Sequence, residues 1–148
     1  VMFCLSKGLS APVGSMLVGS ETFIEKARKN RKLLGGGMRQ LGVLAAAGFV
    51  ALKEMTDRLK EDHDNAAYLA DALDALEGFE VDRNARDINM VFVRSPYDLN
   101  RLKAPLQDEE GILLGGYKGE HMRLVCHSGI SRNDIDRLID ALKRRLNL

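Results

Sequence analysis

The sequence of 148 residues predicts a mixed protein in two parts, an α/β segment followed by a small α+β domain. Two observations lead to this fold class. The chain opens on an apolar run that is typical of a strand and continues into three segments with helical periodicity. From Gly78 onward, short apolar runs alternate with helical segments instead. We therefore place the domain transition within or just after the third helical segment, and assign residues 1–54 to the first part and residues 55–148 to the second.

The first part begins with two short strands joined by a loop. Residues 1–5 are apolar without alternation, which is typical of a strand covered on both faces. Ser6, Lys7 and Gly8 end this run, and a second apolar run follows at 15–18. A lysine at the end of a buried strand is rigidly held, and partial desolvation would lower its pKa and make it a nucleophile or Schiff-base donor. The alternative is a lysine that simply extends its amine into water, as most lysines do.

Three helical segments follow. Ser20 is placed to cap the first, at 20–34, and a run of three glycines at 35–37 ends it. The second, at 38–52, is rich in alanine and glycine, so it should pack closely against its own core or against another subunit. The third, at 54–76, has apolar residues at helical spacing on one side and charged residues on the other.

The second part is predicted to alternate strands and helices. The expected strands are 79–81, 88–93, 112–114 and 122–126, and the expected helices are 99–109 and a final helix that starts at Ser131. Asp134 lies three residues after Ser131, which indicates a capping box at the start of that helix.

Composition excludes several classes of function. The apolar fraction of 45% and the charged fraction of 29% are those of an ordinary globular protein. A net charge of +1 gives no overall attraction to nucleic acid or to an anionic membrane. Cys4 and Cys126 lie inside apolar runs, which favours buried thiols over a disulfide or a metal site. Without a signal peptide or a membrane-spanning run in this sequence, the cytoplasm is the expected compartment.

Cationic residues flank the glycine run. Most basic residues of the segment 20–34 are explained by a solvated helix face. Lys32 lies just before the glycines and Arg39 just after them. Glycines at a helix N-terminus expose backbone N–H groups to an anion, and an arginine on the first turn adds a charged fork. A phosphate or carboxylate near Lys32 and Arg39 is one reading, and a flexible helix break is the other.

Arg123 lies in the middle of the apolar strand expected at 122–126. A charge in such a place is costly unless it is paired, so Arg123 requires an acidic partner or a carboxylate ligand. His127 lies about 13 Å farther along the strand, too far to contact the same small ligand atom. We therefore expect His127 to be a satisfied histidine rather than a catalytic one, and His63 to lie at the surface.

A strand-end lysine, a cationic glycine turn and a strand arginine together suit pyridoxal phosphate chemistry, which needs a Schiff-base lysine, anion contacts and an arginine for an amino-acid carboxylate. Five segments closely resemble the threonine aldolases, which are fold-type I pyridoxal phosphate enzymes. These segments are CLSKGLSAPVGSMLVGS, RKLLGGGMRQLGVLAAAG, RLKEDHDNAAYLA, NMVFVR and MRLVCHSGISRNDID. The resemblance runs in order along essentially the whole chain. It implies the end of a large PLP-dependent transferase-like (aspartate aminotransferase-like) domain, followed by the small C-terminal α+β domain.

The resemblance also implies roles for individual residues. Lys7 matches the Schiff-base lysine, and Ser6 is expected to help position the cofactor. Lys32 and Arg39 match basic residues near the active site of a neighbouring subunit in a dimer or tetramer. Arg123 matches an arginine that grips the substrate carboxylate, for which a bidentate guanidinium suits better than an ammonium. The implied reaction is reversible cleavage of L-threonine or L-allo-threonine to glycine and acetaldehyde.

In the family that the sequence resembles, a large domain precedes the lysine. We therefore expect this chain to be the C-terminal portion of a longer enzyme, inactive until completed. Two alternatives stay open. One is another fold-type I enzyme that acts on a small amino acid, such as a β-eliminating lyase or a serine-handling transferase. The other is a non-catalytic module that uses its small-residue helix for association.

Overall fold

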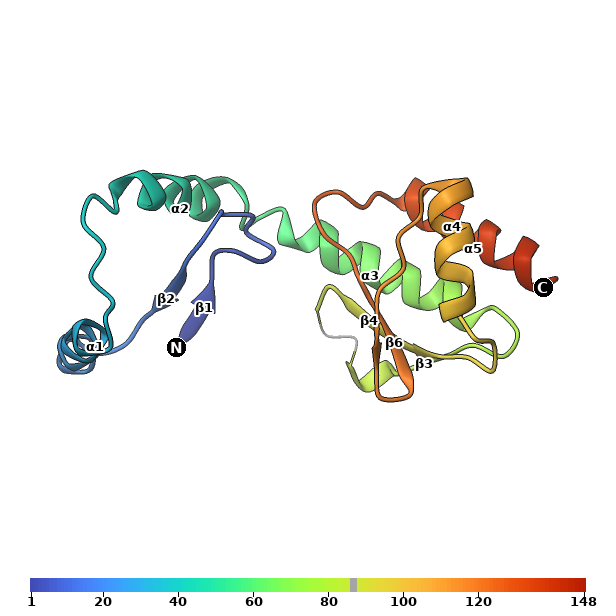
Figure 1. Ribbon diagram of the computed structural model, residues 1–148, viewed down its shortest axis with the longest axis horizontal. Helices are drawn as coiled ribbons and strands as arrows, with labels where there is room; N and C mark the ends of the chain where they lie inside the picture. The colour runs from blue at the N-terminus through green and yellow to red at the C-terminus, as the bar shows by residue number, and fades with distance from the viewer. Residues whose placement is uncertain (86–87) are drawn as a thin grey trace. The chain divides into compact units, whose positions relative to one another are not determined.

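The computed structural model describes residues 1–85 and 88–148 and divides into two compact units, Val1–Leu59 and Lys60–Leu148. The elements of the first unit are β1 (Met2–Cys4), β2 (Ser15–Leu17), α1 (Glu21–Leu33) and α2 (Gly42–Glu54) (Figure 1). Helix α3 (Leu59–Asp74) begins at the last residue of this unit. The predicted helix from residue 54 therefore starts later, because α2 continues to Glu54.

Strands β1 and β2 pair antiparallel, with Phe3 opposite Met16. Strand β1 is more exposed than predicted, since Met2 is 63% exposed, and every residue of β2 is exposed. The expectation of a strand covered on both faces is therefore wrong for residues 1–5 in the described part of the chain. The physical reason is that β2 is the one strand among the described residues that pairs with β1.

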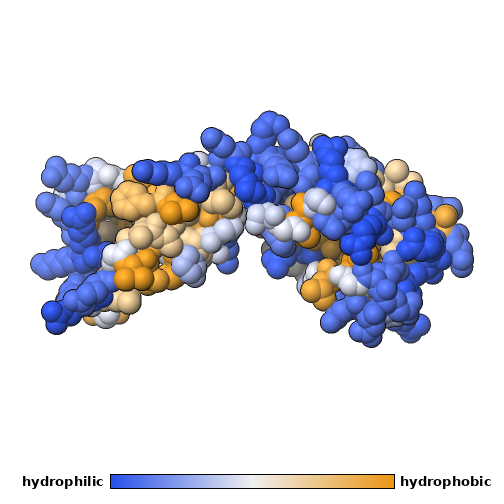
Figure 2. All heavy atoms as spheres, turned by 90° about the horizontal axis from the view of Figure 1, so that it is seen from above, coloured by the Kyte–Doolittle hydropathy of each residue, from blue (hydrophilic) through white to orange (hydrophobic). Residues whose placement is uncertain are grey.

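The two helices of the first unit differ in what they bury. Helix α1 starts directly after Ser20, as predicted, but the Ser20 side chain makes no capping bond and no residue of α1 is buried. Helix α2 starts at Gly42 rather than at residue 38, and it buries Gly48 and Ala51. These two small residues face their own unit, whereas Phe49 and other apolar residues are exposed. Figure 2 shows apolar side chains gathered on the surface of the first unit.

The second unit is a four-stranded antiparallel sheet covered by helices. Its strands are β3 (Glu80–Val81), β4 (Met90–Arg94), β5 (Tyr117–Lys118) and β6 (His121–Val125), in the order β3-β4-β6-β5. Its other elements are the 3₁₀ turn η1 (Arg83–Ala85) and the helices α3, α4 (Asn100–Glu110) and α5 (Arg132–Leu146). Apolar residues of α3 and α5 pack with Val91 and Val93 of β4 and Met122 and Leu124 of β6 in one core.

The segment 112–114 is not the predicted strand, because residues 111–116 leave the sheet before β5 begins. Helix α4 ends at Gly111, whose φ of 67° is the left-handed conformation that suits glycine. Ile112 and Leu114 then pack against the edge of the apolar core. Their side chains therefore satisfy the apolar pattern without a strand ladder.

The ends of α4 and α5 are tied by an ion-pair network. The Glu110 carboxylate accepts hydrogen bonds from Arg144 at 2.7 Å and from Arg145 at 3.0 Å. The Glu110 carbonyl oxygen also accepts one from Arg137 at 2.8 Å. This network holds Glu110, the residue directly before the segment 111–116, in place.

Helix α5 begins with the predicted capping box. The Asp134 N–H donates to Ser131 Oγ, and the Asp134 carboxylate accepts the Ser131 N–H at 2.9 Å. The Ser131 hydroxyl, which donates to the same carboxylate, lowers the pKa of Asp134. Two backbone groups that the helix would leave without a partner are therefore satisfied.

We predict that Ser131→Ala lowers the free energy of unfolding by about 1 kcal/mol, because it removes a side-chain cap. Ser20→Ala is the matched control, since Ser20 occupies the equivalent position of α1 without a side-chain bond. Urea unfolding followed by circular dichroism measures both. Equal losses in the two variants would contradict a stabilising box at Ser131.

Candidate active site

Lys7 lies on the connection between β1 and β2, which comprises residues 5–14. Three backbone hydrogen bonds close this connection, from Ser10 N–H to Lys7 O at 2.9 Å, from Ala11 N–H to Leu5 O at 3.0 Å and from Leu5 N–H to Gly14 O at 2.9 Å. We call residues 5–14 the lysine turn. Its backbone is held by its own hydrogen bonds, so the position of Lys7 is determined locally.

Apolar side chains anchor the lysine turn on both sides of Lys7. Leu5 and Leu9 are buried, with exposed fractions of 6% and 8%, and they pack with Ala11 and with Ala51 of α2. Lys7 and Ser6 are exposed. The predicted partial desolvation of Lys7 is therefore absent in the described part of the chain. The turn presents an accessible amine on an immobilised backbone, which suits a nucleophile.

The glycine run at 35–37 ends α1 rather than starting a helix. Gly35 has a φ of 89°, its N–H donates to Lys32 O at 3.1 Å, and the Gly36 N–H donates to Arg31 O at 2.8 Å. These two bonds form a Schellman motif, the common C-terminal stop of a helix. The prediction that the run exposes free N–H groups at a helix N-terminus is therefore wrong for Gly35 and Gly36, because α1 uses these groups itself.

Lys32 and Arg39 are nevertheless available to an anion. A Cβ placed on Gly37 would lie 2.5 Å from Lys32 Nζ, so the ammonium group lies against this backbone. Within residues 1–85 and 88–148, no carboxylate forms an ion pair with Lys32, Arg39 or Lys7. Cations without a carboxylate partner suit an anionic ligand such as a phosphate.

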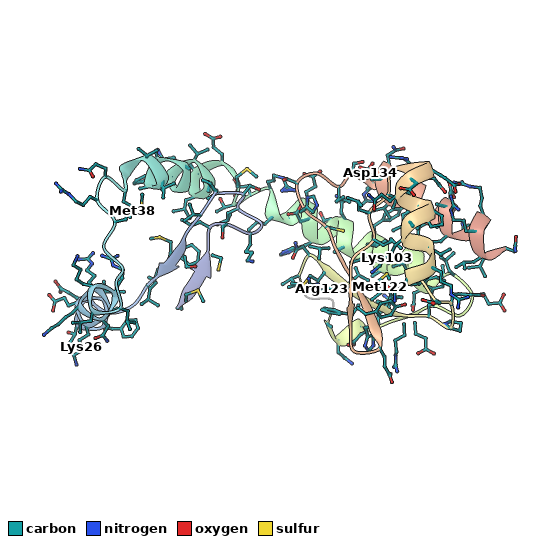
Figure 3. The ribbon with its side chains drawn as sticks, in the orientation of Figure 1. Lys26, Met38, Lys103, Met122, Arg123 and Asp134 are labelled. Atoms are coloured by element: carbon teal, nitrogen blue, oxygen red, sulfur yellow. The ribbon has the colours of Figure 1, made fainter. Side chains whose placement is uncertain are left out.

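Arg123 lies in the middle of β6 and its side chain is exposed. Met122 and Arg123, which are adjacent in β6, belong to opposite faces of the sheet (Figure 3), since Met122 is buried in the core. None of the described carboxylates forms an ion pair with Arg123. Because this side chain is exposed, water can solvate its charge, so the prediction that Arg123 requires an acidic partner or a carboxylate ligand is wrong in the described part of the chain. The guanidinium is nevertheless accessible to a ligand.

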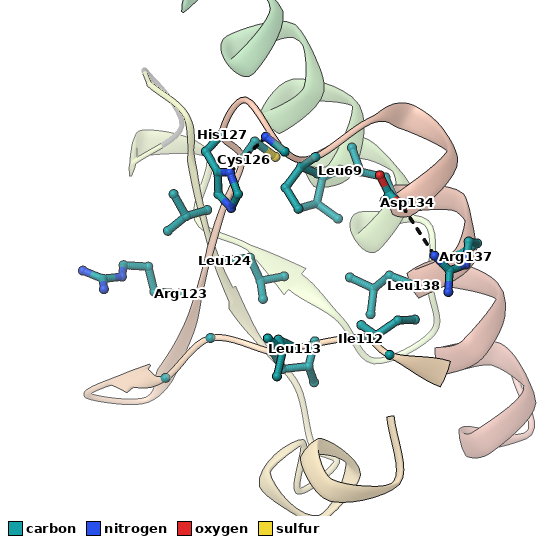
Figure 4. A pocket seen from close by; sticks show the side chains of 18 residues that line it. Leu69, Ile112, Leu113, Arg123, Leu124, Cys126, His127, Asp134, Arg137 and Leu138 are labelled. Atoms are coloured by element: carbon teal, nitrogen blue, oxygen red, sulfur yellow. Dashed lines mark hydrogen bonds and ion pairs between the residues drawn. The ribbon is translucent and has the colours of Figure 1, made fainter. Parts of the chain in front are cut away.

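A cavity of about 550 Å³ lies beside β6, lined by the segment 111–116, by β6 and by the start of α5. Arg123 points away from Leu113 and Leu138, which line the cavity (Figure 4). His127 also lies at the cavity; its side chain is exposed, and its Nδ1 accepts the Gly129 N–H at 3.1 Å. The expectation that it is not catalytic stays a prediction. His63 is exposed, as predicted.

Cys126 is 1% exposed, as its apolar run predicts, whereas Cys4 is only half-buried. Burial raises the pKa of the Cys126 thiol to about 11, and the negative charge of Asp62 adds to the shift. Both thiols are free, so they form no disulfide. The Cys126 thiol therefore stays protonated at neutral pH.

Two residues that contact the β6 backbone on or near Arg123 were missed in the sequence. Asn89 donates from Nδ2 to Cys126 O at 2.6 Å, and the backbone carbonyl oxygen of Asn89 accepts the Cys126 N–H at 2.9 Å. Gly115 lies so close to β6 that a Cβ would be 2.0 Å from Arg123 O. A polar residue inside an apolar run and a pair of glycines before a strand were the available signals.

The candidate residues fall into both units, which the structure describes separately. Ser6, Lys7, Lys32 and Arg39 belong to the first unit, and Arg123 belongs to the second.

None of the described helices is long and apolar enough to cross a membrane.

Comparison with known proteins identifies similar chains. Residues 1–96 match the family model of beta-eliminating lyases. Low-specificity L-threonine aldolase 1 of Arabidopsis thaliana is 46% identical over 139 residues, which cover 91% of this chain and 38% of that protein. Among solved structures, a candidate L-allo-threonine aldolase from Listeria monocytogenes superimposes with a TM-score of 0.78 at 17% identity, covering 97% of this chain and 43% of that one. A PLP-dependent aminotransferase from Streptococcus suis gives a TM-score of 0.65 at 19% identity, with coverages of 97% and 41%.

These similarities confirm the predicted fold class, since the chain has the mixed α/β fold of these structures. The chain spans about two fifths of the length of the relatives and structures that it matches.

We predict that iodoacetamide at about pH 8 modifies Cys4 and leaves Cys126 unmodified, because three pH units below its pKa only about one Cys126 thiol in a thousand is ionised. Mass spectrometry of the labelled peptides measures both sites. In concentrated urea the two cysteines should react alike. Equal labelling of the native protein would show that Cys126 is neither buried nor perturbed.

Proposed function

The chain belongs to the beta-eliminating lyase family, and from this premise we propose that it acts in a pyridoxal 5′-phosphate-dependent lyase. The proposed reaction cleaves L-threonine or L-allo-threonine to glycine and acetaldehyde. The observation that carries this proposal is the similarity of nearly the whole chain to the threonine aldolase of Arabidopsis thaliana. The activity is proposed for the full-length protein that carries this chain, because the chain spans 38% of that relative.

Lys7 is the proposed attachment point of the cofactor. The anchored lysine turn supports this role, because an exposed amine on a rigid backbone can form a Schiff base in a reproducible position. When bound, pyridoxal phosphate supplies the electron sink for cleavage of the bond between Cα and Cβ. Ser6 directly precedes Lys7 and is also exposed, so we propose that its hydroxyl helps to position the cofactor.

Lys32 and Arg39 are proposed to neutralise the cofactor phosphate. Their charges have no carboxylate partner among the residues that the structure describes, which suits an anion bound between them. We propose that they reach the site of a neighbouring subunit in a homodimer or homotetramer. The exposed apolar residues of α2 support association, since a face of this kind is stable in water only when it is covered.

Arg123 is proposed to bind the carboxylate of the amino-acid substrate. Its planar guanidinium can donate two parallel hydrogen bonds to one carboxylate, which fixes both the position and the orientation of the substrate. Without an internal carboxylate partner in the described residues, this guanidinium can make such a pair with a ligand. We propose the cytoplasm as the compartment, with neither nucleic acid nor a membrane as a partner.

We predict that the full-length protein loaded with pyridoxal phosphate produces glycine and acetaldehyde in equal amounts from L-threonine. Acetaldehyde is measured with alcohol dehydrogenase and NADH, and glycine by chromatography. A β-eliminating lyase would release ammonia and 2-oxobutanoate from the same substrate instead. That product would establish the alternative reaction, and a protein that converts neither threonine nor serine would favour the association module.

We predict that borohydride reduction in the presence of pyridoxal phosphate labels the full-length protein at Lys7, as located by peptide mapping. Lys7→Arg should remove this label and lower threonine cleavage at least about a hundredfold, because arginine forms no Schiff base. Lys53→Arg is the matched control, since Lys53 is an exposed lysine of the same unit. A label that survives in Lys7→Arg would assign the cofactor to another residue.

A further inference from the structure

We infer that Asn89 and Gly115 are positioning residues for Arg123 and determine how well the site accepts a substrate carboxylate. This inference rests on the proposed role of Arg123. The guanidinium of Arg123 makes no ion pair with any described residue, so no acidic side chain holds it in place. Its position then depends on the direction in which the β6 backbone projects the side chain.

One edge of β6 is held by the end of the segment 111–116. The Arg123 N–H donates to Gly116 O at 2.9 Å, so the segment is hydrogen-bonded to β6 at Arg123 itself. Gly115 approaches the Arg123 carbonyl so closely that an added Cβ would lie 2.0 Å from the oxygen. The atom that it would meet is backbone, which cannot rotate away as a side chain can. Any residue other than glycine at 115 must therefore displace the segment or β6.

The opposite edge of β6 is held by β4 and by Asn89. In the sheet register Arg123 lies opposite Phe92, and the pairing continues to Met90 opposite Val125. Asn89 extends this pairing by one residue before the start of β4, because its backbone carbonyl oxygen accepts the Cys126 N–H at 2.9 Å and its side-chain amide donates to Cys126 O at 2.6 Å. Asn89 thus holds both backbone polar groups of the residue three positions after Arg123.

The two positioning residues reach Arg123 through the backbone alone. In Figure 4 the Arg123 side chain lies on the far side of β6 from Leu113, which belongs to the same segment as Gly115. The other end of that segment is fixed by the Glu110 network with Arg144 and Arg145. A disturbance at Gly115 therefore moves the Arg123 backbone rather than being absorbed by a loose loop.

The experiment compares Gly115→Ala with Gly116→Ala in the loaded full-length enzyme. Gly116 is the matched control, because an added Cβ there has nothing within 4 Å. Each variant is assayed with L-threonine and with L-threonine amide, which has no carboxylate. Equilibrium binding of glycine and of glycine amide by calorimetry gives a readout that is independent of turnover. Asn89→Ala is the second variant and keeps the test decisive if Gly115→Ala does not fold.

We expect Gly115→Ala and Asn89→Ala to raise the KM of threonine and the Kd of glycine about tenfold, the loss of one good charged hydrogen bond. The constants for both amides should change less than about twofold, and Gly116→Ala should leave all four near their starting values. A merely structural defect would weaken the binding of the amino acids and of their amides alike, and that result would overturn the inference.

Arg123→Gln separates this inference from the proposed function. If Arg123→Gln raises the KM of threonine selectively while Gly115→Ala and Asn89→Ala do not, the positioning inference is wrong and the role of Arg123 stands. If Arg123→Gln leaves the KM of threonine unchanged, Arg123 does not bind the carboxylate, and the inference fails together with that role.

Discussion

Backbone hydrogen bonds, rather than ion pairs, hold the cations on which the proposed chemistry depends. Lys7 lies on a turn closed by three such bonds, and Lys32 lies in the last turn of a helix that its own glycine stop completes. Arg123 lies in a strand paired along both edges. None of the three has a carboxylate partner among the described residues. A cation that must receive a substrate or a cofactor cannot also be neutralised internally, so the main chain has to place it.

Other arginines of the second unit show the opposite arrangement. Arg145 pairs with Glu109 and Glu110, which raise its pKa, and Arg83 pairs with Asp74 and Asp71. The Arg83 side chain is about half exposed, so each of its pairs contributes little to stability alone, whereas Arg145 and Glu110 expose only 21% and 19% of their side chains. The main effect of these ion pairs is on position, since they fix where helices and turns end. The contrast separates arginines that connect elements from Arg123, which is left without such a connection.

Much of the fold could be predicted from the sequence because side-chain periodicity reports burial. The alternation of Met122 and Arg123, and the cap at Ser131, both follow from local pattern. Side-chain periodicity gave wrong predictions where main-chain hydrogen bonding determines the structure. The segment 112–114 is apolar enough for a strand, yet Ile112 and Leu114 pack on the core without a ladder. Lys7 and Arg123 could be found as site candidates by residue type, whereas Asn89 and Gly115 act through main-chain contacts that no periodicity reveals.

Burial of Leu5 and Leu9 on either side of Lys7 has a consequence for the dynamics of the site. The lysine turn cannot open without exposing both leucines, and each contributes about 1.5 to 3 kcal/mol when fully buried. Local opening would then occur less than about one time in a hundred, even at the lower sum of about 3 kcal/mol. Amide hydrogens within the turn should therefore exchange on the timescale of the core around them. The lysine side chain can move quickly while the backbone that carries it stays still.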